Sequence, residues 1–191
     1  MASFATVQDL ANFLQQPVAN SAAQLALDLA SARIRKRTLQ TFDPVVDDVV
    51  VLEGGTDLLR LPQRPVTAVS KVEASWAYAP FAFLAVTEGF QFTRWGPELK
   101  WRGSYAAAGP AWSTYVWPPQ VRITYSHGYD SVPDDVRACA LELARDRYTN
   151  PTGAAEETVD DYSWRAGATA EALLAELVET YKVRYGSVVL R

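Results

Sequence analysis

The stretch QVRITYSHGYDSVPDDVRACALELARDRY, Gln120–Tyr148, contains the strand, turn and helix around which we expect the chain to fold. Its first residues alternate apolar and polar side chains, with the apolar ones at Val121, Ile123 and Tyr125. A period of two is typical of a strand with one buried face. Gly128 then ends the strand, because a turn at this point can need a positive φ. The sequence therefore predicts a half-buried strand followed by a turn.

The second half of this stretch predicts a helix from about Pro133 to Tyr148, with Ser131 as its N-cap. One side of this helix carries a stripe of apolar residues: Val136, Cys139, Ala140, Leu143 and Ala144. Leu141 and Tyr148 make the apolar arc wider than one core contact needs. Two interpretations stay open: a central helix buried on two sides within one subunit, or a helix with one flank against a neighbouring subunit.

Two helices are expected before the strands. The first begins with a capping pattern at Thr6 and Asp9 and ends before Pro17. The second runs from about Ala22 to Leu39, starting after an Asn20-Ser21 cap. It has two opposite apolar seams: Ala22, Leu25, Leu29 and Ala32 form one, and Ala23, Leu27, Ala30 and Ile34 form the other. A helix that is apolar on two sides is packed between layers or between subunits.

A basic cluster closes this second helix, formed by Arg33, Arg35, Lys36 and Arg37. Cations near a helix C-terminus interact favourably with the helix dipole, so stability alone can explain the cluster. The functional alternative is contact with an acidic partner, or transient contact with DNA phosphates. All four residues are candidate interface residues.

Residues 45–127 predict a β module of about six short strands, in a modest sheet or a small barrel. The β-branched run Val45–Leu52 is followed by a turn signal, so Leu58–Leu61 is expected to return as its hairpin partner. The next strand, Val66–Glu73, has its apolar set at positions 66, 68 and 72. Further strand candidates are Phe81–Val86, Phe90–Trp95 and Leu99–Trp101.

Aromatic residues concentrate in this module, with tryptophans at Trp76, Trp95, Trp101, Trp112 and Trp117. Aromatic side chains are core residues by default. However, the segment 103–119 has no periodicity, and loops of this length are usually functional or disordered. Because Trp112 and Trp117 would be poorly solvated in a free loop, we expect an assembly contact and count both as candidate interface residues.

The chain after Pro151 is expected to form an arm, a last helix and a short tail. The arm, 152–168, is first acidic and then alternating, and its Tyr162 and Trp164 are candidate interface residues. Thr169 is expected to cap the helix and Gly186 to end it. Its apolar face contains Leu173, Leu174, Leu177, Val178, Tyr181 and Tyr185. The tail, 187–191, adds the candidate interface residues Val188, Val189 and Leu190.

These elements predict an α+β fold. Helices from both chain ends form a helical body, residues 1–44 and 128–191, with the C-terminal arm and tail attached to it. The small antiparallel β module, residues 45–127, is inserted between them.

Composition narrows the possible functions. The 191 residues are 49% hydrophobic and 21% charged, which is enough to bury a core. A net charge of −4 argues against a protein built for tight binding of phosphate backbones. The N-terminal residues do not resemble a signal peptide, and no apolar run reaches membrane-spanning length.

The sequence does not predict a catalytic or metal site. His127 is the only histidine and Cys139 the only cysteine, so a zinc site would need carboxylates as further ligands. Cys139 lies in a helical stripe, where a buried small apolar side chain is the expected role. The sequence contains no nucleophile elbow, phosphate-binding glycine loop or metalloprotease motif. We expect no enzyme activity and no cofactor.

Three short motifs follow each other in a recurring order: TYSHGY at Thr124–Tyr129, PDDV at Pro133–Val136 and DYS at Asp161–Ser163. This ordered set resembles the head-to-tail adaptor, or connector, proteins of long-tailed double-stranded DNA bacteriophages, and the resemblance spans most of the chain. It implies a structural protein of the virion neck, made in the host cytoplasm, that forms a ring of roughly twelve copies.

The resemblance also implies partners. They are other copies of the same chain, the portal protein, and a stopper or tail-completion protein, while double-stranded DNA passes through the lumen without specific binding and no membrane is involved. The arm is then expected to contact the neighbouring subunit and the tail the portal, unless both pack on their own subunit. The alternative function is another phage neck or tail-completion protein, or a generic α+β protein-binding module.

Overall fold

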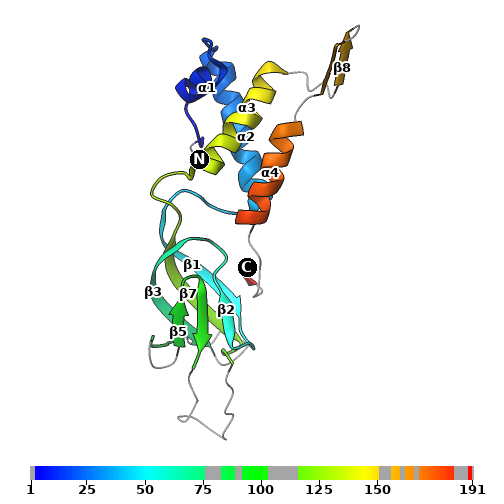
Figure 1. The fold of residues 1–191 in the computed structure, drawn as a ribbon. Coiled ribbons are helices and arrows are strands. Elements are labelled where there is room, and N and C mark those ends of the chain that lie inside the picture. The colour runs from blue at the N-terminus through cyan, green and yellow to red at the C-terminus, as the bar shows by residue number, and fades with distance from the viewer. Residues whose placement is uncertain are drawn as a thin grey trace, which may run out of the picture. The chain divides into compact units, whose positions relative to one another are not determined.

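The computed structural model describes residues 3–75, 83–88, 92–102, 116–150, 156–159, 162–165, 168–182 and 189–190. The chain divides into two compact units. The helical unit consists of Met1–Gln40 and Ser131–Lys182, and the β unit of Thr41–Asp130 and Val183–Arg191. The fold is therefore α+β, as predicted (Figure 1). The last nine residues are grouped with the β unit, whereas the sequence analysis assigned them to the helical body.

The described part of the helical unit contains four helices: α1 (Val7–Leu14), α2 (Asn20–Thr38), α3 (Asp134–Thr149) and α4 (Ala168–Tyr181). Helix α3 contacts α1, α2 and α4, and its most extensive contact is with α2. Its buried residues are those of the predicted stripe: Val136, Cys139, Ala140, Leu143 and Ala144. Leu141 and Tyr148 are half-buried. This arrangement matches the interpretation of α3 as a helix enclosed within one subunit.

The helix starts are only partly as predicted. The capping box of α1 is confirmed: the Asp9 backbone N–H donates to Thr6 Oγ1 at 3.1 Å, and the Thr6 backbone N–H donates to Asp9 Oδ2 at 2.8 Å. The predicted caps of the other helices are wrong. Ala19 and Pro133 occupy the N-cap positions of α2 and α3, and Thr169 lies inside α4. Helix α4 ends at Tyr181, and the predicted stop at Gly186 lies outside the described residues.

Asp9 also connects α1 to α3, because Arg137 Nη2 donates to Asp9 Oδ1 at 2.8 Å. The hydrogen bond from Arg137, and then those from Thr6, lower the pKa of Asp9 from 3.8 to about 2. A carboxyl whose pKa is lower in the folded state stabilises the fold above its unfolded pKa. That stabilisation is lost as the pH falls from about 4 toward 2.

We expect Asp9→Asn to lower the melting temperature at pH 7 and to make its fall between pH 4 and pH 2 shallower. The reason is that the variant loses the charge whose stabilisation disappears in this range. Thermal unfolding followed by circular dichroism at several pH values measures both effects. Asp28→Asn, on the exposed side of α2, is the matched control, and its melting temperature should change with pH as that of the wild type does. If the melting temperature of Asp9→Asn showed the same pH dependence as that of Asp28→Asn, the expectation would be contradicted.

The described part of the β unit contains two antiparallel sheets. The larger has the strand order β10-β1-β7-β3-β4, with β1 (Val45–Glu53), β3 (Val66–Ser75), β4 (Leu84–Ala85), β7 (Gln120–His127) and β10 (Val189–Leu190). The smaller has the order β2-β6-β5, with β2 (Leu58–Arg60), β5 (Phe92–Trp95) and β6 (Glu98–Trp101). A separate hairpin, β8 (Glu156–Val159) with β9 (Tyr162–Arg165), belongs to the helical unit.

Strand β7 lies in the middle of the larger sheet, between β1 and β3. Its burial alternates along the whole strand, and its buried residues are Val121, Ile123, Tyr125 and His127. The strand and its inward face are therefore as predicted. Gly128 follows with a φ of 101°, which confirms the predicted turn with a positive φ.

The predicted hairpin between Val45–Leu52 and Leu58–Leu61 is wrong, because β2 pairs with β6 and β1 pairs with β7 and β10. The turn after β1 is instead hydrogen-bonded to the segment that precedes β7. The Gly54 N–H donates to the Pro119 carbonyl and the Gly55 N–H to the Trp117 carbonyl. The alternation expected in β3 is also interrupted. Register shifts near Ala68 leave that residue exposed.

Among the described residues, no helix combines the length and apolar character needed to cross a membrane.

Candidate assembly interface

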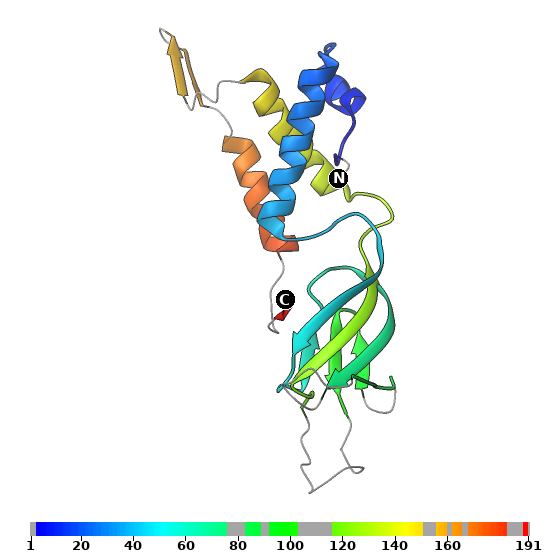
Figure 2. The same ribbon diagram turned by 180° about the vertical axis from the view of Figure 1, so that it is seen from behind.

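The outer face of α2 carries exposed apolar residues. Of the two predicted seams, Ala23, Leu27, Ala30 and Ile34 are buried in the helical unit. The other seam is exposed, and we call it the α2 seam: Ala22, Leu25, Leu29 and Ala32. Leu25 is 61% exposed and Leu29 46%. Figure 2 shows α2 in front of α3, with α4 beside it. The sequence predicted that α2 is covered on both sides. The subunit itself covers only the side with Ala23, Leu27, Ala30 and Ile34.

The basic cluster at the end of α2 is divided between internal contacts and the surface. Arg33 forms an ion pair with Glu171 of α4, and the Arg35 guanidinium lies over the Phe4 ring, 4.1 Å from its centroid. Lys36 and Arg37 are exposed. The cations in the last turn of α2 also interact favourably with the helix dipole, so helix stability explains part of the cluster. The exposed pair Lys36 and Arg37 stays available to a partner.

Trp117 is a core residue, and its prediction as an interface residue is wrong. Its side chain is 1% exposed and packs against Phe92 and Trp101, with ring centroids 5.6 and 4.8 Å away. Its indole Nε1–H donates to the Leu99 carbonyl at 3.0 Å. The second aromatic candidate of this segment, Trp112, lies outside the described residues.

The arm and tail candidates lie in short strands. Tyr162 and Trp164 belong to β9 of the separate hairpin, where only the backbone is described. Val189 and Leu190 form β10 and pair with Leu52 and Val51 of β1. The described part of the tail thus extends a sheet of its own subunit, as in the alternative interpretation. Val188 lies outside the described residues.

Two further exposed apolar residues lie on β1 and were not predicted as interface residues from the sequence. Val46 is 77% exposed and Val49 56%. The signal was present in the run Val45–Leu52, where both faces of the expected strand carry valines. A strand that is apolar on both faces indicates contacts on both sides.

His127 and Cys139, the two residues that a catalytic or metal site would be most expected to use, are both buried. His127 is 3% exposed, and its Nε2 lies 3.2 Å from Asp48 Oδ2. Cys139 is buried, as predicted, and burial and the nearby Glu171 raise the pKa of its thiol to about 11. A thiol with this pKa is protonated at neutral pH and unreactive. The described residues contain no group of three or more His, Cys, Asp or Glu side chains that can hold a metal ion.

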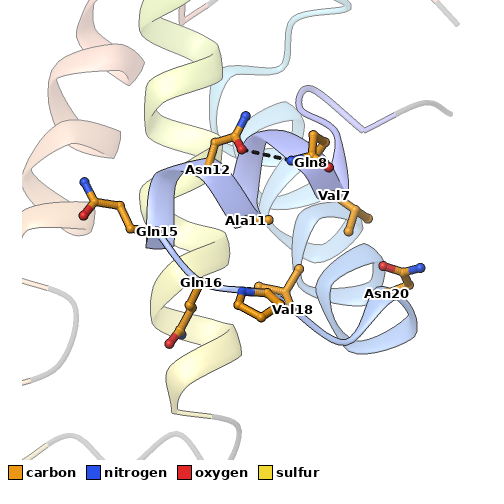
Figure 3. Close-up of a pocket in the computed structure, with 9 residues that line it drawn as sticks. Val7, Gln8, Ala11, Asn12, Gln15, Gln16, Val18 and Asn20 are labelled. Carbon is orange, nitrogen blue, oxygen red and sulfur yellow. Dashed lines mark hydrogen bonds between the residues drawn. The ribbon is translucent and has the colours of Figure 1, made fainter.

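A hollow of about 570 Å³ lies between α1 and the start of α2 (Figure 3). Its polar lining consists of amides, and the Gln8 Nε2–H donates to Asn12 Oδ1 at 2.9 Å. The other lining residues are Val7, Ala11, Gln15, Gln16, Pro17, Val18 and Asn20. None of the nine is charged or nucleophilic, so the hollow suits neutral polar contacts and not catalysis.

No protein-family model and no curated protein matches the chain. The solved chains that are similar to it include the following three. They are found in the neck of an empty gene transfer agent particle computed with C6 symmetry, the neck of a native particle computed with C12 symmetry, and a native virion. Their identities are 18, 17 and 18%, and their TM-scores 0.47, 0.49 and 0.49. The matches cover 95, 93 and 96% of this chain and 90, 88 and 93% of theirs. With TM-scores below 0.5, we infer the function from the residues of this chain.

Proposed function

We propose that this chain is a structural, non-enzymatic protein of a phage-like virion neck. It is a head-to-tail adaptor that forms a ring between the portal and the stopper or tail, and DNA passes through this ring. The order of the motifs TYSHGY, PDDV and DYS supports the class of protein. The single observation that carries ring formation is the exposed α2 seam, because leucines at 61 and 46% exposure gain stability when a second copy covers them.

The described motif residues have structural roles, which suits a structural protein. Tyr125 and His127 are buried in the β unit, and Gly128 makes the turn. Tyr129 donates its backbone N–H to the Phe42 carbonyl at 3.0 Å, and its ring stacks on that of Phe42. Val136 is fully buried in the helical unit. These residues hold the fold, and none of them is arranged as a nucleophile with its base.

The charge distribution supports passage of DNA without specific binding. The net charge is −4, and every cation fixed against phosphates would add salt-dependent affinity. Arg33 and Arg35, half of the basic cluster, are engaged by Glu171 and Phe4. The remaining cations of the cluster, Lys36 and Arg37, then face a protein partner.

We expect the double variant Leu25→Asp/Leu29→Asp to abolish rings while the monomer stays folded. Each leucine is worth about 1.5–3 kcal/mol when it is fully buried, and an aspartate in its place would lose its hydration in the interface. Native mass spectrometry and negative-stain imaging measure assembly, alone and on the cognate portal. Circular dichroism verifies the fold. Ala138→Asp, at an exposed position of α3, adds the same side chain away from the seam and should leave assembly unchanged.

Two results would contradict the proposal. One is a wild-type chain that stays monomeric both alone and with the portal, or that is absent from the neck of purified virions. The other is a double variant that assembles as well as the wild type, because the α2 seam would then have no part in the ring.

A further inference from the structure

Strand β1 contains a β-bulge at Asp47. Val45 of β1 pairs with His127 of β7. Asp48, three residues further along β1, pairs with Tyr125, which is only two residues back along β7. One residue of β1 is therefore extra, and Asp47 has a φ of 53°, in the left-handed region that residues other than glycine rarely adopt. A bulge of this kind changes the direction in which the side chains of a strand point.

The bulge turns Val46 to the outer face of the sheet. In a regular strand Val46 would share a face with Asp48 and Val50. That face is the inner one, because Val50 is 8% exposed. The extra residue reverses the alternation, and Val46 is 77% exposed. It therefore shares the outer face with Val49, which is 56% exposed, and the two valines occupy successive outward positions on β1.

Two serines of neighbouring strands fix this bulge. The Asp47 backbone N–H donates to Ser126 Oγ of β7 at 3.2 Å, and the Ser70 hydroxyl of β3 donates to Asp47 Oδ1 at 2.8 Å. Left-handed conformations of residues other than glycine persist only where the surroundings hold them, and they cluster at functional sites. Here the strained residue places two valines together in water. Apolar surface of this kind gains stability when a partner covers it.

The edge of β1 beside these valines is open. In the order β10-β1-β7, the described pairs on the β10 side of β1 involve only Val51 and Leu52. The described residues place no strand against that side of Val45–Val50. An exposed apolar edge can pair with a further strand, and proteins normally cover or block such edges. The short strand β10 shows that this edge accepts an antiparallel strand.

The β8–β9 hairpin also lacks a neighbour. Within the described part of the chain, its two strands pair with each other and with no third strand. A single two-stranded hairpin is marginally stable in water, and it becomes stable when a third strand or a packing surface is added. The hairpin and β1 therefore each have an edge that a further strand would complete.

We propose that β9 of one copy pairs antiparallel with Val45–Val50 of β1 in the next copy. The inference rests on the proposed ring and specifies one pair of surfaces that holds two copies together, in addition to the α2 seam. Each copy gives its hairpin to one neighbour and receives the hairpin of the other neighbour at β1. Such a heterologous contact is the kind that closes a ring.

The sequence of β9 has the spacing that this pairing needs. Tyr162 and Trp164 are two positions apart, so they belong to the same face of β9. In the antiparallel arrangement Val49 lies opposite Tyr162, and Val46 lies opposite Trp164. Cross-strand pairs of an aromatic with a β-branched residue stabilise a sheet. Without the bulge, Val46 and Val49 would belong to opposite faces and could not both meet this face of β9.

The charges select β9 of the hairpin over β8. The bulged part of β1 carries Asp47 and Asp48, and β8 begins with Glu156 and Glu157. Like charges opposite each other on paired strands are destabilising, so β8 is the wrong partner for this edge. Strand β9 carries a single charge, the cation of Arg165. The acidic strand β1 therefore pairs with the basic strand of the hairpin.

Blocking the open edge tests the proposal. We expect Val46→Lys/Val49→Lys to raise the protein concentration needed for half-assembly by about tenfold or more, because lysines on an edge strand oppose the addition of another strand. Leu84→Lys/Ala85→Lys is the matched control. It places two lysines at exposed positions of β4, on the opposite edge of the same sheet, and should leave assembly unchanged. Sedimentation velocity across a concentration series measures assembly, and circular dichroism verifies the fold.

A cross-link tests the register directly. A Val49→Cys protein is mixed under oxidising conditions with an affinity-tagged Tyr162→Cys protein, and the tag distinguishes the mixed dimer by mass. We expect a disulfide-linked mixed dimer, because opposite residues of paired strands have Cα atoms within the range of this bond. Leu84→Cys mixed with Tyr162→Cys is the control and should stay unlinked, although Leu84 is as exposed as Val49. The native Cys139 is buried and protonated, so it does not compete.

The outcomes separate this inference from the proposed function. The strand pairing requires both results, a weaker assembly of the β1 lysine variant and the mixed disulfide. If the wild type forms rings and either result is missing, the pairing is overturned while the ring adaptor stands. A β1 lysine variant that forms rings normally but no longer binds the portal would also overturn it, because the edge would then belong to the portal. A wild type that never forms rings overturns both.

Discussion

Replacing Trp117 with alanine is expected to lower the free energy of unfolding of the β unit by about 3–5 kcal/mol. The side chain is 1% exposed, so the truncation leaves a cavity that the surrounding strands fill only in part. The contacts with Phe92 and Trp101 are lost, and the Leu99 carbonyl loses the hydrogen bond from the indole. A hydrogen bond of this kind contributes about 1 kcal/mol.

Urea unfolding followed by circular dichroism measures the change for Trp117→Ala, with the fluorescence of the remaining tryptophans as a second probe. Trp95→Ala is the matched control, because Trp95 belongs to the small sheet against which Trp117 packs but is 58% exposed. We expect it to change the stability by less than about 1 kcal/mol. Equal losses for the two variants would show that Trp117 does not have the core role that its burial indicates.

Trp117 also shows where the sequence could not predict the structure. The segment 103–119 has no periodicity, so nothing local distinguishes a core residue from an interface residue. The partners of Trp117 are Phe92 and Trp101, which are contributed by β5 and β6. Such contacts between residues far apart in sequence leave no short-range pattern. The same reason explains the wrong hairpin: a turn signal after β1 predicted local pairing, whereas β2 pairs with the more distant β6.

The elements predicted correctly have patterns that are complete within a few residues. The alternation in β7 and the apolar stripe of α3 each define a buried face without reference to the rest of the chain. The two seams of α2 were also predictable, because the helical period separates them. Which seam the subunit buries depends on where α3 and α4 pack, so only the structure identifies Leu25 and Leu29 as exposed.

We expect Gly128→Ala to destabilise the β unit by about 4 kcal/mol or more, which is the range of substitutions at strained, closely packed backbone positions. Gly128 has a φ of 101°, which residues with a Cβ rarely adopt. A Cβ at this position would lie 2.3 Å from the Asp43 carbonyl oxygen and 2.9 Å from the Pro44 Cα. Both are backbone atoms, so no side-chain rotation relieves the overlap, and the turn must move away from Pro65, whose carbonyl accepts the Gly128 N–H at 3.0 Å.

Gly55→Ala separates the two causes, because Gly55 has a similar φ of 87° with no atom within 4 Å of an added Cβ. It should cost about 1–2 kcal/mol, the conformational penalty alone. The difference between the two variants in urea unfolding then measures the close approach of the chain around Asp43 to the end of β7. If Gly128→Ala costs no more than Gly55→Ala, the glycine of the TYSHGY motif is required only for its φ. If it costs several kcal/mol more, the motif requires glycine because two backbone segments meet there.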